Sequence, residues 1–131
     1  MGGFIKVDAK RVETTALNTK VDRNVFNDFK IYAKELGYPM NVILETFMRQ
    51  YTNGRFSIDS KDIIKWKKDD YELDTLNTTF NKEIYVNFKR ACKDNGYFVR
   101  CVIMAIMEKF ASRNYILEYK NIEEIKREDE E

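Results

Sequence analysis

Two asparagines, Asn18 and Asn77, occupy matching places in two similar short stretches of this 131-residue chain. An asparagine amide presents a donor and an acceptor side by side, so it can form two hydrogen bonds to a planar partner such as an adenine edge. Residues two positions away suit related contacts, because lysine donates to guanine acceptors and threonine or alanine methyl groups touch thymine methyl groups. The candidate base-contacting set is Ala16, Asn18, Lys20, Thr75, Asn77 and Thr79.

The chain lacks several residue types that catalytic and metal sites commonly use. The chain contains no histidine, so the commonest acid–base catalyst and every histidine-containing metal site are missing. Cys92 and Cys101 stand among apolar neighbours, which predicts buried, reduced thiols. A nuclease or strand transferase that uses one of the eight tyrosines would lack its activating groups. We therefore expect no catalysis, no metal and no cofactor.

The stretches around the two asparagines belong to an internal repeat. Residues 15–56 align with residues 74–115 at a constant offset of 59 without gaps, and nine of the 42 positions are identical. Chance would give about two or three identities on ordinary amino-acid usage. The pattern indicates a duplication. The identical pairs are Leu17/Leu76, Asn18/Asn77, Thr19/Thr78, Phe29/Phe88, Lys30/Lys89, Lys34/Lys93, Gly37/Gly96, Tyr38/Tyr97 and Met48/Met107.

Each copy begins with a short stretch of alternating polarity, residues 16–21 and 75–80. A period of two is typical of a strand, in which successive side chains point to opposite faces. The more apolar face carries Leu17, Thr19 and Val21 in one copy and Leu76, Thr78 and Phe80 in the other. The six candidate base-contacting residues are consequently predicted to lie on the outward faces of the two strands.

Two helices follow the strand in each copy. Asp22 and Asn81 are suitable N-cap residues, and Gly37 and Gly96 suit the left-handed position after a helix. A second stripe of apolar residues at helical spacing runs over 40–51 and again over 99–110. One strand and two short helices cannot bury such a stripe alone, so we expect the two copies to pack together.

A strand, a helix, a glycine turn and a second helix within some 40 residues resemble one unit of the ribbon-helix-helix family of the Arc and MetJ repressors. Two units in one chain resemble the tandem arrangement of TraY-type conjugation proteins. The resemblance implies a mainly α fold: a tandem ribbon-helix-helix pseudodimer with a two-stranded antiparallel β-ribbon over a four-helix core.

The predicted organisation has five parts. The first ribbon-helix-helix unit (15–56) and the second (74–115) pack as one domain, 15–115. They are flanked by an N-terminal arm (1–14) and joined by a linker (57–73) with room for a short helix. Residues 116–131 are predicted to form a C-terminal helix and an acidic tail, because Ile116, Tyr119, Ile122 and Ile125 recur every three residues. That segment either packs on the body or offers a docking surface to another protein or a second copy of this one.

The resemblance implies that the ribbon enters the major groove of double-stranded DNA, where its outward side chains contact base edges. It also implies a phosphate contact at the start of each second helix, at Met40 and Asn41 and at Val99 and Arg100. The chain departs from the family pattern here, because neither turn supplies a hydroxyl cap. Further candidate backbone contacts are Lys6, Lys10 and Arg11 in the arm and Lys61, Lys65, Lys67 and Lys68 in the linker.

Charge and hydropathy limit the kinds of partner and the cellular compartment that we expect for this protein. Residues 1–115 carry 20 Lys/Arg and 15 Asp/Glu, whereas residues 116–131 carry three and seven, so the body is mildly basic and the tail acidic. No apolar run approaches the roughly 20 residues that span a bilayer, and the start lacks the apolar stretch of a secretion signal. We expect a cytoplasmic protein without a membrane partner.

Several biological roles remain open on the sequence. The chain is expected to be a sequence-specific DNA-binding protein, either a transcriptional repressor or a DNA-site accessory factor of a plasmid or phage. The partners considered are double-stranded DNA and further copies of this chain on adjacent DNA subsites. The alternative is an antitoxin or a protein-interaction module that acts through the C-terminal segment, residues 116–131.

Overall fold

The two alternating stretches form strands that pair with each other. The computed structural model describes residues 13–68, 71–118 and 121–124 of the chain. Within it, β1 (Thr14–Asp22) and β2 (Leu73–Asn81) run antiparallel, with Asn18 directly opposite Asn77 at the middle of the register. Antiparallel pairing satisfies the backbone donors and acceptors that a lone strand would leave open.

The first helix of each copy starts and ends where the sequence predicts. The Asp22 carboxylate accepts a hydrogen bond from the Val25 amide (2.8 Å) at the start of α1 (Arg23–Leu36). The Asn81 side-chain oxygen accepts one from the Ile84 amide (3.1 Å) at the start of α4 (Lys82–Asp94). Side-chain caps of this kind satisfy amides that have no partner within the helix.

The turn after each first helix uses a glycine in the left-handed region. Gly37 has a φ of 78° and Gly96 a φ of 80°, values that are costly for residues with a Cβ. The chain then reverses into the second helices, α2 (Met40–Thr52) and α5 (Val99–Ala111). The predicted boundaries of all four helices are confirmed to within a residue or two.

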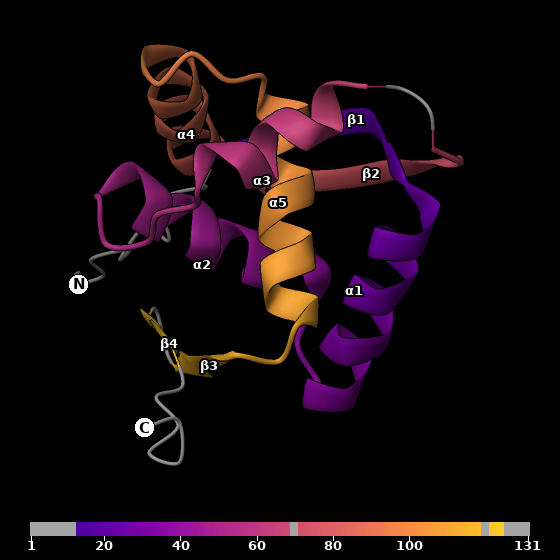
Figure 1. Ribbon diagram of the computed structural model, residues 1–131. Coiled ribbons are helices and arrows are strands. Elements are labelled where there is room, and N and C mark those ends of the chain that lie inside the picture. Colours follow the sequence, from indigo (N-terminus) through magenta and orange to yellow (C-terminus); the bar gives the residue numbers. More distant parts are fainter. Residues whose placement is uncertain (1–12, 69–70, 119–120, 125–131) are drawn as a thin grey trace, which may run out of the picture.

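The apolar stripes of the second helices supply most of the core. Every residue of α5 from Cys101 to Met107 is buried. Figure 1 shows α5 (orange) in the middle of the molecule, with α1 (indigo) on one side and α2 and α4 on the other. Cys92 and Cys101 are both buried free thiols, as the sequence predicts.

Packing contacts recur at the same offset of 59 as the sequence. The rings of Tyr51 and Phe88 meet edge to face, with centroids 5.6 Å apart and planes at 69°. Their counterparts in the other copy, Phe110 and Phe29, meet at 5.5 Å and 66°. Each pair joins the second helix of one copy to the first helix of the other, so each copy completes the other's core.

The linker contains a short helix that covers one side of α5. Helix α3 (Ser60–Ile64) is followed by a 3₁₀ turn, η1 (Lys65–Lys67), and both contact α5. Ile63 is buried, whereas its neighbour Ile64 remains 49% exposed. The expectation of a short linker helix is therefore confirmed, but of the two isoleucines only Ile63 is buried.

The C-terminal segment is a hairpin where the sequence predicted a helix. β3 (Tyr115–Glu118) pairs antiparallel with β4 (Asn121–Glu124), beyond the end of α5 in Figure 1. The prediction of a C-terminal helix over 116–131 is wrong for these residues. Arg113 has a φ of 62°, which ends the helical path, and the Tyr115 ring then packs against Phe47 and Phe56. The acidic end, residues 125–131, lies outside the described residues.

The fold of the described residues is mixed α/β, and the predicted two-stranded antiparallel ribbon is part of it. These residues form five α-helices, the β1–β2 sheet and the second hairpin, β3–β4. The strand content exceeds the prediction because aromatic and β-branched residues favour strands when tertiary contacts hold them extended. No helix in the described ranges has the length and apolarity needed to cross a membrane.

Candidate nucleic-acid interface

The ribbon brings the six predicted base-contacting residues onto one surface. They form three cross-strand pairs: Ala16 opposite Thr79, Asn18 opposite Asn77, and Lys20 opposite Thr75. Residues directly opposite in an antiparallel pair lie on the same face of the sheet. Five of the six are exposed, and Thr75 is half-buried. The outward face is thus a small polar surface centred on two asparagine amides.

The inward face explains why this surface is held in place. Val21, Leu76 and Phe80 are completely buried in the core, and Leu17 is partly buried against it. Because side chains alternate along a strand, anchoring these residues turns their neighbours outward. The predicted alternation is confirmed in both strands.

The two ends of the outward face are unequal. At one end the Lys20 ammonium donates a hydrogen bond to the Thr75 hydroxyl across the ribbon (2.7 Å). At the other end Ala16 stands opposite Thr79, so only one hydroxyl and no charge is present. One end therefore offers a cation and the other offers mainly methyl groups.

A surface hollow continues the outward face at its charged end. Its volume is about 500 Å³, and it is lined by Asn18, Thr19, Lys20, Leu73 and Arg100. The first four come from the ribbon, whereas Arg100 comes from the first turn of α5. The hollow joins a predicted base-contacting pair, Asn18 and Lys20, to a predicted phosphate-contacting residue.

The starts of α2 and α5 are alike in backbone and differ in side chains. Pro39 and Phe98 precede the helices in an extended conformation, and neither makes a side-chain cap in the described structure. No side-chain cap takes up the first amides of these two helices, and the helix dipole favours an anion there.

The four residues predicted to contact phosphate divide into two kinds. Met40 and Val99 are partly buried and pack on the core, so only their backbone amides suit an anion. Asn41 and Arg100 are half-buried and carry the polar side chains. Arg100 places a cation at the start of α5, whereas Asn41 leaves the start of α2 neutral.

Two residues near Arg100 were not singled out from the sequence. The Arg100 guanidinium donates a hydrogen bond to the Tyr71 hydroxyl. Phe98 is 64% exposed, and the Lys67 ammonium lies 5.9 Å from its ring centroid. Their positions depend on how the linker returns across the start of α5, so no local pattern could have revealed them.

The structure also separates the linker cations. Lys65 forms an ion pair with Glu108 of α5 (2.8 Å), so its charge is neutralised within the protein. Lys61, Lys67 and Lys68 are exposed. Lys6, Lys10 and Arg11 of the arm lie outside the described residues.

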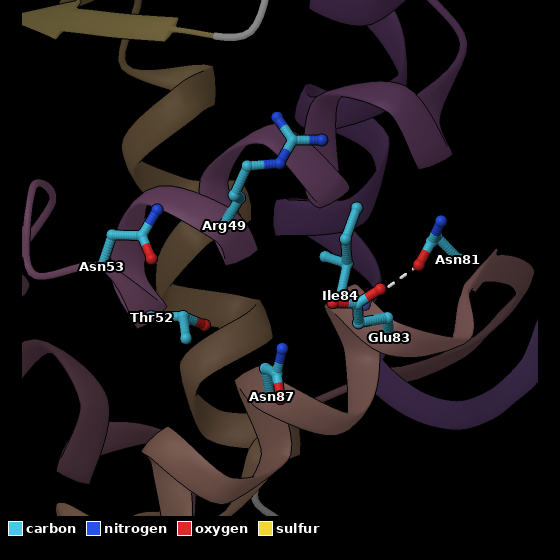
Figure 2. A pocket seen from close by; sticks show the side chains of 7 residues that line it. All are labelled: Arg49, Thr52, Asn53, Asn81, Glu83, Ile84 and Asn87. Atoms are coloured by element: carbon cyan, nitrogen blue, oxygen red, sulfur yellow. Dashed lines mark hydrogen bonds between the residues drawn. The ribbon is translucent and has the colours of Figure 1, made fainter.

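A second pocket lies away from this surface. About 270 Å³ in volume, it lies between α2 and the start of α4, and none of the predicted site residues lines it. Figure 2 shows its seven lining side chains. The side-chain oxygen of Asn81 accepts a hydrogen bond from the Ile84 backbone amide. The Arg49 guanidinium points away from the other six side chains. We assign this pocket no part in the nucleic-acid interface.

Among the described residues, no titratable group with a resolved pKa shift lies on the outward face of the ribbon. Burial raises the pKa of the Cys92 thiol to about 12. Burial also raises the pKa values of Tyr51 and Tyr85. No cluster of metal-binding side chains occurs among the described residues. These shifts belong to packing and supply no reactive group to the ribbon surface.

Comparisons with known protein families, with curated proteins and with solved structures found no significant match.

Proposed function

We propose that this protein binds double-stranded DNA sequence-specifically by inserting the β1–β2 ribbon into the major groove. The observation that carries the proposal is the register, which sets the exposed Asn18 and Asn77 side by side at the centre of the outward face. Two strands about 4.8 Å apart fit a groove about 12 Å wide. Each asparagine can then form a bidentate pair with an adenine.

The register also supports a tandem ribbon-helix-helix pseudodimer. Shifting Ala16, Asn18 and Lys20 by 59 gives Thr75, Asn77 and Thr79. If each residue is replaced by its equivalent in the other copy, the Ala16–Thr79 pair becomes the Lys20–Thr75 pair. The Asn18–Asn77 pair becomes itself. A quasi-two-fold axis therefore passes through the asparagine pair. The DNA site is expected to be centred there, with unequal halves.

Backbone contacts would fix this docking. The first turns of α2 and α5 flank the ribbon in the proposed complex, and backbone amides at a helix start suit phosphate oxygens. Arg100 adds a charge-assisted contact on one side. The surface hollow shared by Lys20 and Arg100 favours simultaneous base and phosphate contact at that end.

For the biological role we propose transcriptional repression or the marking of a DNA site for plasmid or phage functions. Neither role needs a cofactor or a catalytic group on the ribbon. The location of the bound sequence distinguishes them: a repressor site overlaps a promoter, whereas an accessory site lies at a transfer or partition locus.

The direct test is selection of bound sequences from a random duplex pool. The preferred duplex is then titrated with the wild type, Asn18→Ala, Asn77→Ala and the double variant. Asn27→Ala is the matched control, because Asn27 is an exposed asparagine on α1, outside the ribbon. We expect the ribbon variants to lose about 1–3 kcal/mol of discrimination per contact while non-specific affinity persists.

Two results would contradict the proposal. One is the absence of DNA binding even at low salt, where the non-specific electrostatic contribution is largest. The other is unchanged sequence preference in the Asn18→Ala/Asn77→Ala double variant. A loss of preference shared by Asn27→Ala would point to unfolding instead, and circular dichroism of each variant separates that case.

A further inference from the structure

The junctions between each ribbon strand and its first helix carry only half of a local cap. The side chains of Asp22 and Asn81 accept the amides of Val25 and Ile84. In a complete capping box, a glutamate or glutamine at the third helical position accepts the backbone amide of the N-cap residue in return. Val25 and Ile84 occupy that position here, and their side chains accept no hydrogen bond. The backbone amides of the two N-cap residues therefore need acceptors from elsewhere in the fold.

In both junctions the missing acceptor comes from the second helix of the other copy. The Asn81 amide donates a hydrogen bond to the Glu45 carboxylate of α2 (2.9 Å). The Asp22 amide donates one to the Met104 sulfur of α5 (3.3 Å). Glu45 and Met104 are equivalent positions at the offset of 59. Each copy thus completes the capping box of the other.

The next contacts at the two junctions are equivalent as well. The Arg23 amide donates to the Glu72 carbonyl (2.8 Å), and the Lys82 amide donates to the Glu13 carbonyl (2.9 Å). The side chains of the same residues form the ion pairs Arg23–Glu72 (3.2 Å) and Lys82–Glu13 (3.5 Å). Among these contacts between the copies, the acceptor of the N-cap amide is the one that differs in chemistry. It is a carboxylate at one junction and a thioether, a weak acceptor, at the other.

The residues that supply these acceptors lie one turn beyond predicted phosphate contacts. Glu45 follows Asn41 by four residues on α2, and Met104 follows Arg100 by four residues on α5. Residues four apart lie on the same face of a helix. One face of each second helix therefore carries both the predicted phosphate contact and the acceptor for a ribbon end. The hydrogen bond joins the ribbon to the helix whose start would contact DNA.

We propose that Glu45 and Met104 are positioning residues for DNA reading, an inference that rests on the proposed function. Glu45 holds the end of the ribbon that carries Thr79, and Met104 holds the end that carries Lys20. Phosphate contacts fix the orientation of a protein on the duplex, and base contacts read the sequence from that orientation. Base discrimination thus requires the ribbon and the helix starts to keep a fixed relation, which these two hydrogen bonds provide.

Two substitutions of Glu45 test its role with matched charge. Glu45→Leu and Glu45→Gln both remove the carboxylate charge, and only glutamine keeps a side-chain oxygen that can accept the Asn81 amide. The readouts are the hydrogen-exchange rate of that amide, measured by NMR without DNA, and the ratio of affinities for the selected duplex and a random duplex. Glu45→Leu should raise the exchange rate about tenfold and lower the affinity ratio about threefold to tenfold, whereas Glu45→Gln should change each by less than about twofold.

The affinity ratio separates positioning from stability. A variant that only lowers the folded fraction weakens binding to both duplexes equally and leaves their ratio unchanged. Circular dichroism of each variant checks that the fold is retained.

Met104→Leu is the reciprocal variant. It removes the sulfur acceptor while nearly conserving volume at a fully buried position. Sequence selection should show relaxed preference in the half of the site that depends on Lys20, which Lys20→Ala identifies. Glu45→Leu should relax the opposite half, and more strongly, because a carboxylate is a better acceptor than a thioether.

Three results would overturn the positioning role. The first is equal exchange of the Asn81 amide in Glu45→Leu and Glu45→Gln. The second is an equal affinity ratio in these variants although their exchange rates differ. The third is relaxation spread evenly over both halves of the site. Absence of sequence preference in the wild type would overturn the proposed function and this role with it, and the exchange rates, measured without DNA, distinguish that failure from a failure of the cap.

Discussion

Asn18 of β1 lies directly opposite Asn77 of β2, and the two are also equivalent positions of the internal repeat. A self-equivalent pair of this kind occurs only where a two-fold relation passes through the ribbon. The remaining outward positions, Ala16 and Lys20 on β1 and Thr75 and Thr79 on β2, then differ solely by side chain. The backbone of the ribbon is therefore symmetric, whereas the side chains of its outward face are not.

Making the two outward faces identical should make the preferred DNA site more symmetric. The double variant Ala16→Thr/Lys20→Thr gives β1 the same outward series as β2, Thr-Asn-Thr. Threonine is a good strand former, so the ribbon should be retained. Selection from a random duplex pool should yield a site closer to a palindrome than that of the wild type.

The control for this variant is Thr14→Ser, a conservative change at the start of β1 that leaves the three central pairs intact. It should keep the asymmetric site. If the double variant also selects the asymmetric wild-type site, then the outward residues of β1 do not contribute to base preference.

Arg100 should contribute one phosphate contact. Arg100→Gln removes the charge beside the hollow shared with Lys20. The slope of log affinity against log salt should become shallower by about one, with little change in sequence preference. Fluorescence anisotropy on the selected duplex between low and moderate salt measures this slope.

Lys34→Gln is the matched control for Arg100, because Lys34 is an exposed cation in the last turn of α1, outside the predicted DNA-contacting set. Its salt slope should equal that of the wild type. An equal reduction in both variants would indicate a general charge effect and no specific clamp at α5.

Removing either first-helix cap should destabilise the fold. Asp22→Ala and Asn81→Ala each remove a side-chain oxygen that accepts a hydrogen bond from a backbone amide in the first turn of the helix. The loss should be about 1 kcal/mol in each case, and larger for Asp22, which is buried. Urea unfolding gives the values. Asn24→Ala, in the exposed first turn of α1, should change stability by less than about 0.5 kcal/mol.

Stability should fall in alkaline solution. Burial raises the pKa of Cys92 from 9.0 to about 12, and it also raises those of Tyr51 and Tyr85 from 10.0. Since these groups ionise more readily in the unfolded chain, their contribution is complete below pH 9 and is lost as the pH rises towards 12. Urea midpoints across this range measure the effect. Cys92→Ala should be less stable at neutral pH but should show a weaker decline, and an unchanged decline would exclude the thiol as a cause.

The sequence predicted the local elements well because their signals are local. The caps at Asp22 and Asn81 and the glycines at 37 and 96 act on the backbone within a turn of their own positions. The alternation in each strand likewise depends only on neighbouring residues. Repetition of the whole pattern at one offset also predicted that the two copies pack together.

The same local reasoning failed at the C-terminal segment. Apolar residues at every third position suggested a helix, yet the observed hairpin begins at Tyr115, whose ring packs against Phe47 and Phe56 from far along the chain. Aromatic and β-branched residues adopt whichever extended or helical form their tertiary contacts favour. Distant aromatic contacts therefore outweighed the weak periodicity.

The sequence by itself determined which residues face outward on β1 and β2 and where the four helices of the repeat begin and end, because steric and hydrogen-bonding preferences of neighbouring residues decide these features. Only the tertiary structure decided that Asn18 meets Asn77, that Lys20 donates to Thr75, and that Arg100 is joined to Tyr71. These relationships link residues 29 to 59 positions apart, and they depend on how the two copies settle in a shared core. The polar face follows from local chemistry, and its register follows from packing.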